Sequence, residues 1–482
     1  MTSGIGNQRY SPARACALLG AMAMAIAGAP GEALAHAADR GHVLLLPTGY
    51  YLIGGAAAVA VSFLVLTIAP PAALARLAAL RIAAGSLPVW PRFAFSLMTF
   101  LLLCALVATG FMGSRDPLSN PLPLTVWTLF WIGLTLVQGV VGNVWWWIDP
   151  WYAPWRAFTA LGRINTPLVR LPDWLGYWPA IVQFLGFAWF ELVYPAPDDP
   201  ERLAIAIIVY FSVNLAAMVV FGHAAWSRRG ECLSAFLRMI STLGVVEGTH
   251  TGRGRLAIAL CLPGARLATA PALPVSGALF LLLALSSVSF DGLMRTFFWL
   301  GLFDVNPLEF PGRSAVMGIG SFGLVASFAA LAAAFFAATG LGQRIASRPA
   351  TVASAGALVW SIIPISLAYH FSHYLTTLVI NGQYALAALS DPLMNGADLF
   401  GTAGMHVQAG MFMGADSAWL VWNLQAAAII GGHLLAVLVA HAIAYRIHRD
   451  ARIAALSQAP LALLMVLYTV FGLWLLSSPT AM

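Results

Sequence analysis

The chain contains no lysine and little charge of either sign. Charged residues make up 9% of its 482 residues, and hydrophobic residues make up 60%. Soluble domains are typically about 25% charged, so the composition excludes a chain of several soluble domains. Apolar runs of about 20 residues recur, and each is long enough to cross a bilayer core of about 30 Å. The sequence therefore predicts an all-α, polytopic integral membrane protein whose main partner is the lipid bilayer.

The sequence also lacks the motifs of several common enzyme classes. It has no Walker A sequence, no G-x-S-x-G elbow, no H-E-x-x-H and no dinucleotide-binding glycine pattern. The formal net charge of +6 would suggest a nucleic-acid partner in a soluble protein. In a membrane protein, arginine gathered in cytoplasmic loops explains this charge. We therefore expect no nucleic-acid partner.

Residues 1–35 have the three parts of a secretory signal peptide. Arg9 and Arg14 precede the apolar stretch 15–29, and the sequence Ala-Leu-Ala at 33–35 is a cleavage site of the small-x-small type. Cleavage there makes His36 the first mature residue. A second register, Ala-His-Ala at 35–37, would remove that histidine, and an uncleaved anchor is a further alternative.

Residues 36–482 are predicted to form a single helical transmembrane domain with about ten spans. The expected spans are 47–68, 93–113, 123–146, 176–194, 203–225, 274–290, 315–339, 352–380, 418–445 and 461–476. With lysine absent, arginine alone shows the orientation. Alternate connections are rich in arginine, whereas the others are acidic. We therefore expect a bacterial inner-membrane protein whose mature N and C termini are both periplasmic.

Two features of the cytoplasmic connections indicate contact with the membrane surface. Tryptophans cluster at positions 145, 146, 147, 151 and 155, as in the aromatic belt of a membrane interface. Segment 227–270 has apolar residues at helical spacing around Phe236, Ile240 and Leu243. This segment is expected to be a cytoplasmic interfacial helix.

Polar residues within the spans are the main functional signal, because ionisable groups in a bilayer are costly. In the eighth span His370 and His373 lie on one helix face, one turn apart, so that both imidazoles can reach one metal ion. His433 of the ninth span lies at a compatible depth, and Glu191 lies near the outer surface of the fourth. Histidines with a carboxylate suit a divalent metal such as zinc or copper. The alternative is that these groups form interhelical hydrogen bonds and only set packing.

A second constellation is predicted outside the membrane. The periplasmic Met/His loop 382–417 carries Met405, His406, Met411 and Met413, and the mature N-terminus adds His36 and His42. Thioether and imidazole ligands suit copper, which makes these residues a secondary copper candidate. The loop is also rich in glycine, so it is equally interpreted as a flexible lid over an outward-facing cavity.

The segment AHAADRGHVLLLPTGYYL at 35–52 resembles the start of a group of proteobacterial polytopic membrane proteins labelled fenitrothion hydrolase. The resemblance covers about the first tenth of the chain specifically, and the rest in length and helical plan. It implies hydrolysis of an apolar organophosphorus-type ester, and it brings no catalytic residues with it.

Two functions follow from these observations. The first is a membrane-embedded hydrolase with a periplasm-facing site, in which a metal held by His370, His373 and His433 supplies hydroxide and Glu191 is a ligand or base. The second is a transporter of a metal ion or small molecule that uses the same histidines as its site.

Overall fold

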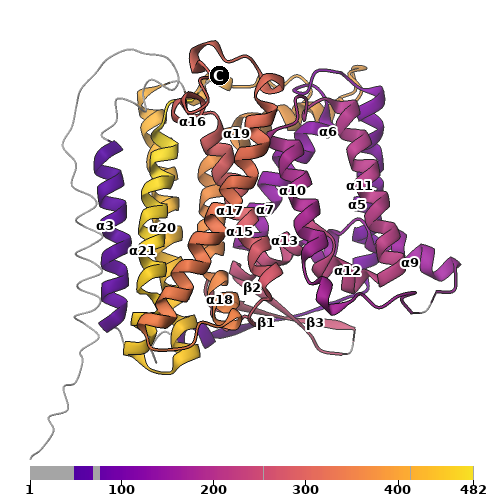
Figure 1. The fold of residues 1–482 in the computed structure, drawn as a ribbon. Helices are drawn as coiled ribbons and strands as arrows, with labels where there is room; N and C mark the ends of the chain where they lie inside the picture. The colour runs from indigo at the N-terminus through magenta and orange to yellow at the C-terminus, as the bar shows by residue number, and fades with distance from the viewer. Residues whose placement is uncertain (1–47, 69–75, 165, 253, 413, 481–482) are drawn as a thin grey trace, which may run out of the picture.

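The computed structural model describes residues 48–68, 76–164, 166–252, 254–412 and 414–480. Long helices stand side by side in one bundle, which confirms the predicted all-α polytopic membrane fold (Figure 1). In the described part of the chain, nine helical segments are long and apolar enough to cross a membrane. They are α3 (Thr48–Ile68), α5 (Pro91–Met112), Pro121–Val140, α11 (Pro200–Phe221), α15 (Val275–Met294), α17 (Arg313–Ile345), Val352–Ser390, α20 (Ala415–His448) and α21 (Ala451–Ser477). The predicted signal peptide lies outside the described residues.

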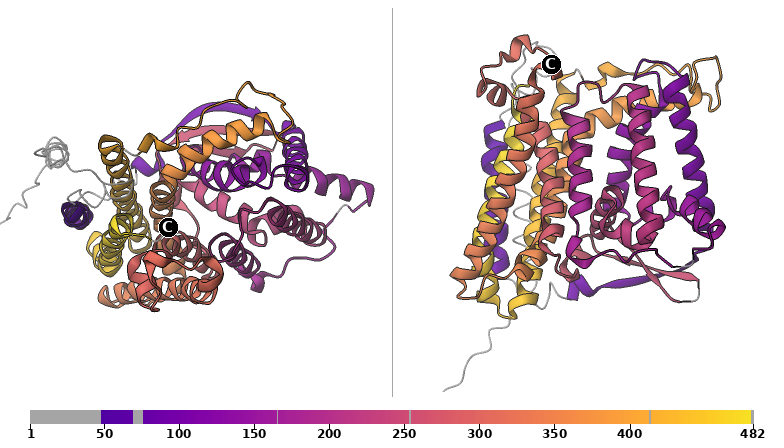
Figure 2. Two further views of the ribbon diagram at one scale, coloured as in Figure 1. Left: turned by 90° about the horizontal axis from the view of Figure 1, so that it is seen from above. Right: turned by 45° about the vertical axis from the view of Figure 1, so that its right-hand side comes forward.

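The predicted span 176–194 is the shorter helix α10 (Trp178–Leu192), which has 15 residues. At 1.5 Å per residue it rises about 22 Å, less than a full bilayer core. Figure 1 and the right-hand view of Figure 2 show it beside α11, among the longer helices. Helix α10 therefore crosses much of the bundle without the length of an isolated membrane span.

Two of the membrane segments are not continuous α-helix. Segment Pro121–Val140 begins as α6 (Pro121–Pro123), continues as the π-helix η1 (Leu124–Leu134) and ends as α7 (Thr135–Val140). Segment Val352–Ser390 contains α18 (Val352–Leu358), the 3-10 turn η5 (Val359–Ile362) and α19 (Ile363–Ser390). Wide or tight helical turns of this kind are frequent at functional sites, and η1 packs against α19.

Strands β1 (Arg81–Pro88), β2 (Val246–His250) and β3 (Arg255–Cys261) form one antiparallel sheet in the order β1-β3-β2. We call the end of the bundle that carries this sheet the sheet end (Figure 1). The sequence predicts a single interfacial helix for 227–270, whereas the structure has α12 (His223–Arg229), α13 (Cys232–Ile240), the turn η3 (Ser241–Leu243) and two strands there. Phe236, Ile240 and Leu243 are buried, so their helical spacing reflects packing inside the bundle.

The connections predicted to be periplasmic all lie at the opposite end, which we call the loop end. It comprises segments 113–120, 193–199, 295–312 and 391–412, with helix α16 (Phe297–Gly301) and the turns η4 (Pro307–Glu309) and η6 (Ala409–Phe412). The described C-terminal residues also lie there (Figure 1). Connections alternate between the two ends as the arginine pattern requires.

The tryptophan cluster differs from a simple aromatic belt. Trp145 and Trp151 are buried, and their indole N–H groups donate to Ser234 Oγ at 2.9 Å and to the Phe211 carbonyl at 3.1 Å. The cluster spans α8 (Trp145–Ile148) and α9 (Tyr152–Leu161) at the sheet end. The shorter elements η2 (Asp173–Leu175) and α14 (Ala265–Thr269) complete that end.

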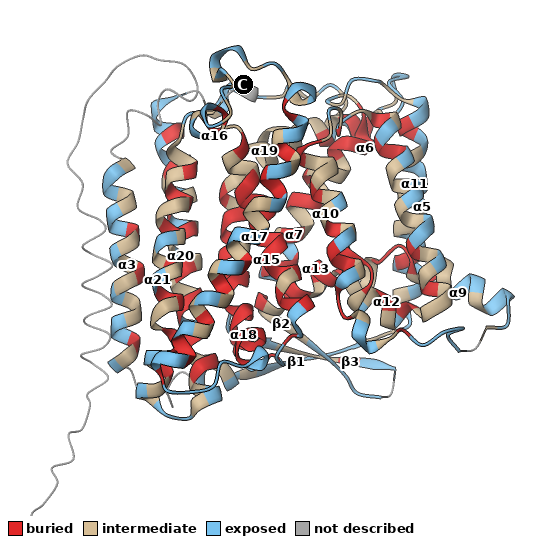
Figure 3. Cartoon of the chain, viewed as in Figure 1, coloured by how far each residue is buried: buried red, intermediate tan, exposed pale blue. Residues whose placement is uncertain are grey.

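Burial is greatest in the centre of the bundle. Helices α15 and α18 and the first part of α19 are largely buried, whereas α3 at the edge has few buried residues (Figure 3). Polar residues on the central helices therefore lie among protein groups and away from lipid. The candidate site lies on these helices.

Candidate functional site

A cavity of about 660 Å³ extends into the bundle from the loop end. Its walls come from η1, α10, α15, α19, α20 and the end of α21. Charged and polar residues in the lining include Glu191, Asp198, Asp291, Arg295, Arg313, His373, Tyr374 and Gln425, and aromatic residues include Trp127, Trp131, Tyr369, Phe412 and Trp422. Ligand pockets for small organic molecules are about 300–1,000 Å³ and combine apolar walls with a few polar groups. The cavity has both properties.

His373 of α19 and Asp291 of α15 form the central hydrogen-bonded pair of this cavity. Nε2 of His373 lies 2.8 Å from Asp291 Oδ2. Their side chains are 25% and 17% exposed, so the pair is partly open to the cavity. The Asp291 carboxylate accepts a hydrogen bond from Nε2–H, and this favours the tautomer in which Nδ1 is unprotonated and keeps its lone pair. Nδ1 makes no hydrogen bond to the described residues and lies beside the cavity-lining Gly292.

Tyr374 joins this pair to Glu191 of α10. Its hydroxyl lies 2.8 Å from Asp291 Oδ2 and 3.1 Å from Glu191 Oε1. A phenol has one proton, so it can donate to only one of two carboxylates at a time. Both contacts are satisfied when one carboxyl group carries a proton and donates to the phenol oxygen. Glu191, Tyr374, Asp291 and His373 therefore form a network suited to holding an exchangeable proton.

Two arginines line the same cavity at the loop end. Nη1 of Arg313 donates to the carbonyl oxygens of Glu191 at 2.8 Å and of Tyr194 at 3.4 Å, which ties the start of α17 to the end of α10. Arg295 directly follows α15 and also lines the cavity. These side chains place positive charge at the wall that holds the carboxylates.

Three buried donors in the cavity wall have no hydrogen-bond partner among the described residues. They are the indole Nε1 of Trp131, the hydroxyl of Tyr369 and the indole Nε1 of Trp422, and these residues are 3%, 2% and 1% exposed. Buried polar groups are nearly always hydrogen-bonded. Unpaired donors in a cavity wall favour a polar group of a bound molecule as their partner.

His370 lies outside this cavity lining. Its Nε2 is 3.1 Å from the Trp131 carbonyl oxygen on η1, and its ring meets the rings of Trp131 and Tyr374 edge-on at 5.2 and 5.0 Å. The residue is 2% exposed. His370 thus packs behind Tyr374 and holds α19 against the π-helical turn.

His433 faces another part of the bundle. Its Nδ1 is 2.8 Å from the Ile429 carbonyl oxygen one turn earlier, its ring is 6.4 Å from that of Tyr468 on α21, and the residue is fully buried. Gly432 is the residue of α20 that touches α19, since a Cβ built there would lie 2.5 Å from Ala368 Cβ. One residue further along a helix points about 100° away, so His433 turns from α19 toward α21.

The predicted metal ligands therefore have separate partners. His370, His373 and His433 are each hydrogen-bonded to a different group. In the described part of the chain no group of three or more His, Cys, Asp or Glu side chains is arranged to hold a metal ion. The donors present do not fit the predicted three-histidine site, although His373 and Glu191 do share the cavity.

The secondary copper candidate is only partly described. Met405, His406 and Met411 lie in the loop between α19 and α20, where the Gln383 side-chain amide donates to Met411 Sδ at 3.7 Å. Phe412 of the same loop lines the cavity. His36, His42 and Met413 lie outside the described residues. The loop thus contributes to the cavity wall, and the copper site stays a prediction.

Sequence reasoning missed Asp291, Arg295 and Arg313. The predicted span 274–290 ended one residue before Asp291, whereas α15 continues to Met294 and places this carboxylate inside the helix. The cost of an ionisable group in a span, which singled out Glu191, would have singled out Asp291 as well.

No protein-family model, no curated protein and no solved structure matches the chain.

Proposed function

We propose that the protein is a membrane-embedded hydrolase that cleaves an apolar ester in the loop-end cavity. The observation that carries the proposal is the His373–Asp291 pair, which opens into a ligand-sized cavity beside Glu191 and Tyr374. One such cavity provides a base, a proton donor and positive charge. Ester hydrolysis needs these three functions together.

His373 is the general base in this proposal. Asp291 holds Nε2–H and orients the ring, which leaves Nδ1 to take a proton from a water molecule in the cavity. The resulting hydroxide attacks the carbonyl carbon or phosphorus atom of the ester. Asp291 also stabilises the imidazolium that forms.

Glu191 is the general acid. When it is protonated, it can donate to the Tyr374 oxygen 3.1 Å away, which leaves the Tyr374 proton for Asp291, and it can pass its own proton to the departing alkoxide or phenoxide. The proton taken up by His373 then leaves to solvent, and Glu191 regains one through Tyr374. Arg295 and Arg313 stabilise the negative charge that develops on the ester oxygen.

The aromatic part of the lining favours an apolar substrate. Trp127, Trp131 and Trp422 contribute aromatic atoms to the cavity wall, and such a wall suits an apolar molecule. This agrees with the organophosphorus-type ester that the resemblance of segment 35–52 implies. Aryl phosphotriesters and aryl carboxylic esters are therefore the first substrates to assay.

We further propose that the loop end faces the periplasm of the inner membrane. Arginines are concentrated at the sheet end, including Arg344 and Arg348, as the positive-inside rule requires of a cytoplasmic face. Single cysteines at Asp304 and Arg344 test this in intact cells. An impermeant maleimide should label the first position only, and labelling of the second from outside would reverse the orientation.

The test of hydrolysis compares purified wild type with His373→Gln. The matched control is His250→Gln, an exposed histidine of β2 at the sheet end. We expect turnover of an aryl ester by wild type and by the control, and a loss of about 10²–10⁴-fold in His373→Gln. Equal turnover by folded His373→Gln and wild type would refute the assignment of the base.

Proton-coupled transport of a small molecule is the second candidate, favoured by a polar chain that leads from Gln183 of α10 toward α12 at the sheet end. Gln183 of α10 donates to the Gly230 carbonyl oxygen at 2.9 Å and accepts from Asn214 at 3.0 Å. Asn214 in turn accepts from the Trp226 indole at 2.8 Å. Proteoliposomes with an internal pH dye distinguish the functions. Substrate-dependent acidification without product would favour transport.

A further inference from the structure

A second cavity, of about 190 Å³, lies at the sheet end, far along the bundle from the first. It is formed by the start of α5, segment 143–149, α12 and α13. Its basic lining residues are Arg92, His223, Arg228 and Arg238, and its one acidic lining residue is Asp149. The cavity is smaller than the pockets of drug-sized molecules, and its size suits a small charged group.

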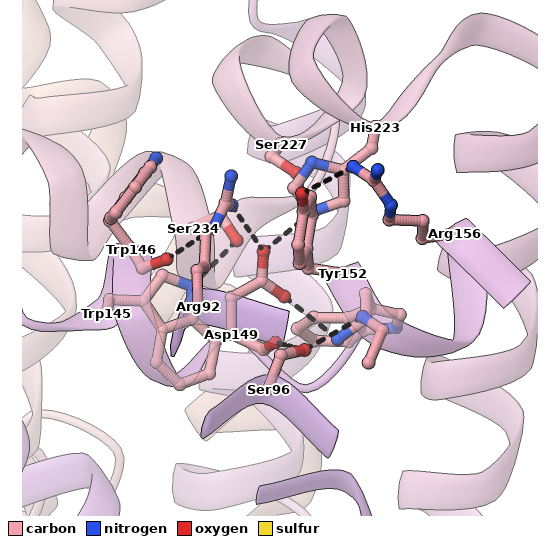
Figure 4. Close-up of polar contacts among 12 residues, drawn as sticks. Arg92, Ser96, Trp145, Trp146, Asp149, Tyr152, Arg156, His223, Ser227 and Ser234 are labelled. Atoms are coloured by element: carbon pink, nitrogen blue, oxygen red, sulfur yellow. Dashed lines mark hydrogen bonds and ion pairs between the residues drawn. The ribbon is translucent and has the colours of Figure 1, made fainter. Parts of the chain in front are cut away.

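Asp149 is already neutralised by its own neighbours (Figure 4). Its Oδ2 lies 2.7 Å from Nε2 of His223 and 3.8 Å from Nη2 of Arg92, and its Oδ1 accepts the Trp151 backbone N–H at 2.9 Å. The carboxylate is 3% exposed. One buried negative charge thus has a cation and an imidazole as partners, and it cannot also balance the other arginines.

Arg92 is held rigidly in this wall. Its guanidinium carbon lies 4.3 Å from the Trp146 ring centroid and 3.9 Å from that of Tyr152, and its Nε donates to the Trp146 carbonyl oxygen at 2.7 Å. Figure 4 shows the side chain between the two rings. An arginine fixed in this way loses little conformational entropy when it binds a further partner.

The remaining arginines have donors to spare. Arg238 donates through Nη2 to the Tyr177 hydroxyl at 3.2 Å and to the Arg228 carbonyl oxygen at 3.0 Å, but its buried Nε has no partner among the described residues. The exposed side chain of Arg228 makes no hydrogen bond or salt bridge to any of the described residues. Both line the cavity. A buried guanidinium N–H without a partner beside a second free cation points to an anionic ligand.

The neighbouring helix places this cavity at the depth of lipid headgroups. Helix α9 carries Phe158 and Leu161, whose exposures are 60% and 86%, with the exposed Arg163 just beyond it. A short helix with bare apolar and basic residues lies in the interfacial layer of a membrane. Phosphate groups are the anions concentrated there.

We propose that the sheet-end cavity binds the phosphate group of an anionic ligand, through Arg228, Arg238 and Arg92. Two sources share this chemistry, an anionic phospholipid headgroup and a soluble phosphate ester. Basic pockets between membrane helices on the cytoplasmic side are suited to lipid headgroups, and the interfacial position of α9 favours that source. The site is independent of the loop-end cavity and of the reaction proposed there.

The test uses the detergent-purified full chain in two binding assays. Native mass spectrometry measures retention of phosphatidylglycerol against phosphatidylcholine, and thermal unfolding measures stabilisation by inorganic phosphate against chloride at equal ionic strength. The variants are Arg228→Gln, on an exposed side chain, and Arg238→Gln. Arg452→Gln is the control, because Arg452 is exposed in α21 at the same end and does not line the cavity.

A lipid headgroup site gives retention of phosphatidylglycerol over phosphatidylcholine that weakens about fivefold in Arg228→Gln, the equivalent of about 1 kcal/mol for one basic residue. A site for a soluble ester gives a phosphate-dependent rise in Tm that shrinks in Arg228→Gln and Arg238→Gln. The control matches wild type in both cases. If neither lipid preference nor phosphate stabilisation depends on Arg228 or Arg238, the proposal is wrong.

Discussion

Replacing Asp291 by asparagine removes one negative charge from the centre of the proposed site and keeps the shape of the side chain. Asp291 Oδ2 accepts two hydrogen bonds, from His373 Nε2 and from the Tyr374 hydroxyl, each at 2.8 Å. Hydrogen bonds to charged groups contribute about 1.5–3 kcal/mol each. Asparagine can place its one oxygen at this position, but a bond to a neutral acceptor contributes only about 0.5–1.5 kcal/mol, so about half of this stabilisation should remain. We expect Asp291→Asn to lower the free energy of unfolding by about 1.5–3 kcal/mol.

The effect on turnover should be larger than the effect on stability. Without the carboxylate, His373 loses the partner that fixes the proton on Nε2, so Nδ1 is no longer held as the base. A positioned base accelerates its reaction by about 10²–10⁴-fold. We therefore expect Asp291→Asn to lose turnover by that factor per folded molecule. The assay is hydrolysis of an aryl ester at several pH values, with the folded fraction measured by thermal unfolding.

The matched control for this variant is Asp304→Asn at the same end of the bundle. Asp304 is exposed and has a φ of 55°, a conformation that asparagine tolerates well. The control should keep both stability and turnover. Turnover by folded Asp291→Asn within about twofold of wild type, far short of the loss expected for a base, would refute the assigned role of the pair.

Three further predictions concern packing, metal and pH. Gly342→Ala should destabilise the protein by about 1–3 kcal/mol or more, because the new Cβ would lie 1.9 Å from a backbone carbonyl oxygen of α21. The control is Gly340→Ala on the same helix, where a new Cβ meets nothing within 4 Å. This control should be neutral or stabilising in thermal unfolding. Metal analysis of His370→Ala/His373→Ala beside wild type should give equal metal content, and loss of one equivalent would restore the sequence-based metal site. The hydrogen bond from Ser390, with those from loop backbone N–H groups, lowers the pKa of Asp398. The stability that this carboxylate contributes is fully present above its unfolded pKa of about 3.9, and it disappears as pH falls through the lower pKa of the folded state. The Tm difference between wild type and Asp398→Asn should therefore shrink in acid.

The membrane helices could be predicted from the sequence because their signal is local. Apolar runs long enough to span a bilayer have few alternative structures, and the predicted ends of most spans lie within a few residues of the observed helices. The exceptions depend on tertiary contacts. Strand β3 pairs with its neighbour β2 and also with β1, which lies about 170 residues earlier in the chain. No local pattern in segment 246–261 indicates that partner.

The candidate site could be predicted only in part. The helical spacing of the eighth span indicated His373, and the cost of burying charge indicated Glu191. Both residues line the cavity. Depth in the membrane says nothing of the direction in which a side chain points around its helix. His433 lies on α20, next to α19, yet it faces α21 because Gly432 occupies the helix contact. Asp291 was missed because the predicted span ended at residue 290, a few residues before the observed end of α15 at Met294.

Reaction of the histidines with diethyl pyrocarbonate tests the central claim most directly, since it needs no knowledge of the substrate. Among the histidines of α19 and the central part of α20, His373 is partly exposed, whereas His370 and His433 are 2% and 0% exposed. Peptide mass spectrometry of briefly treated, folded protein should show His373 modified. His370 and His433 should react only after unfolding. The assignment of His373 as a base exposed to the cavity would be contradicted by either of two results. One is that His370 or His433 is modified as fast as His373, and the other is that His373 does not react.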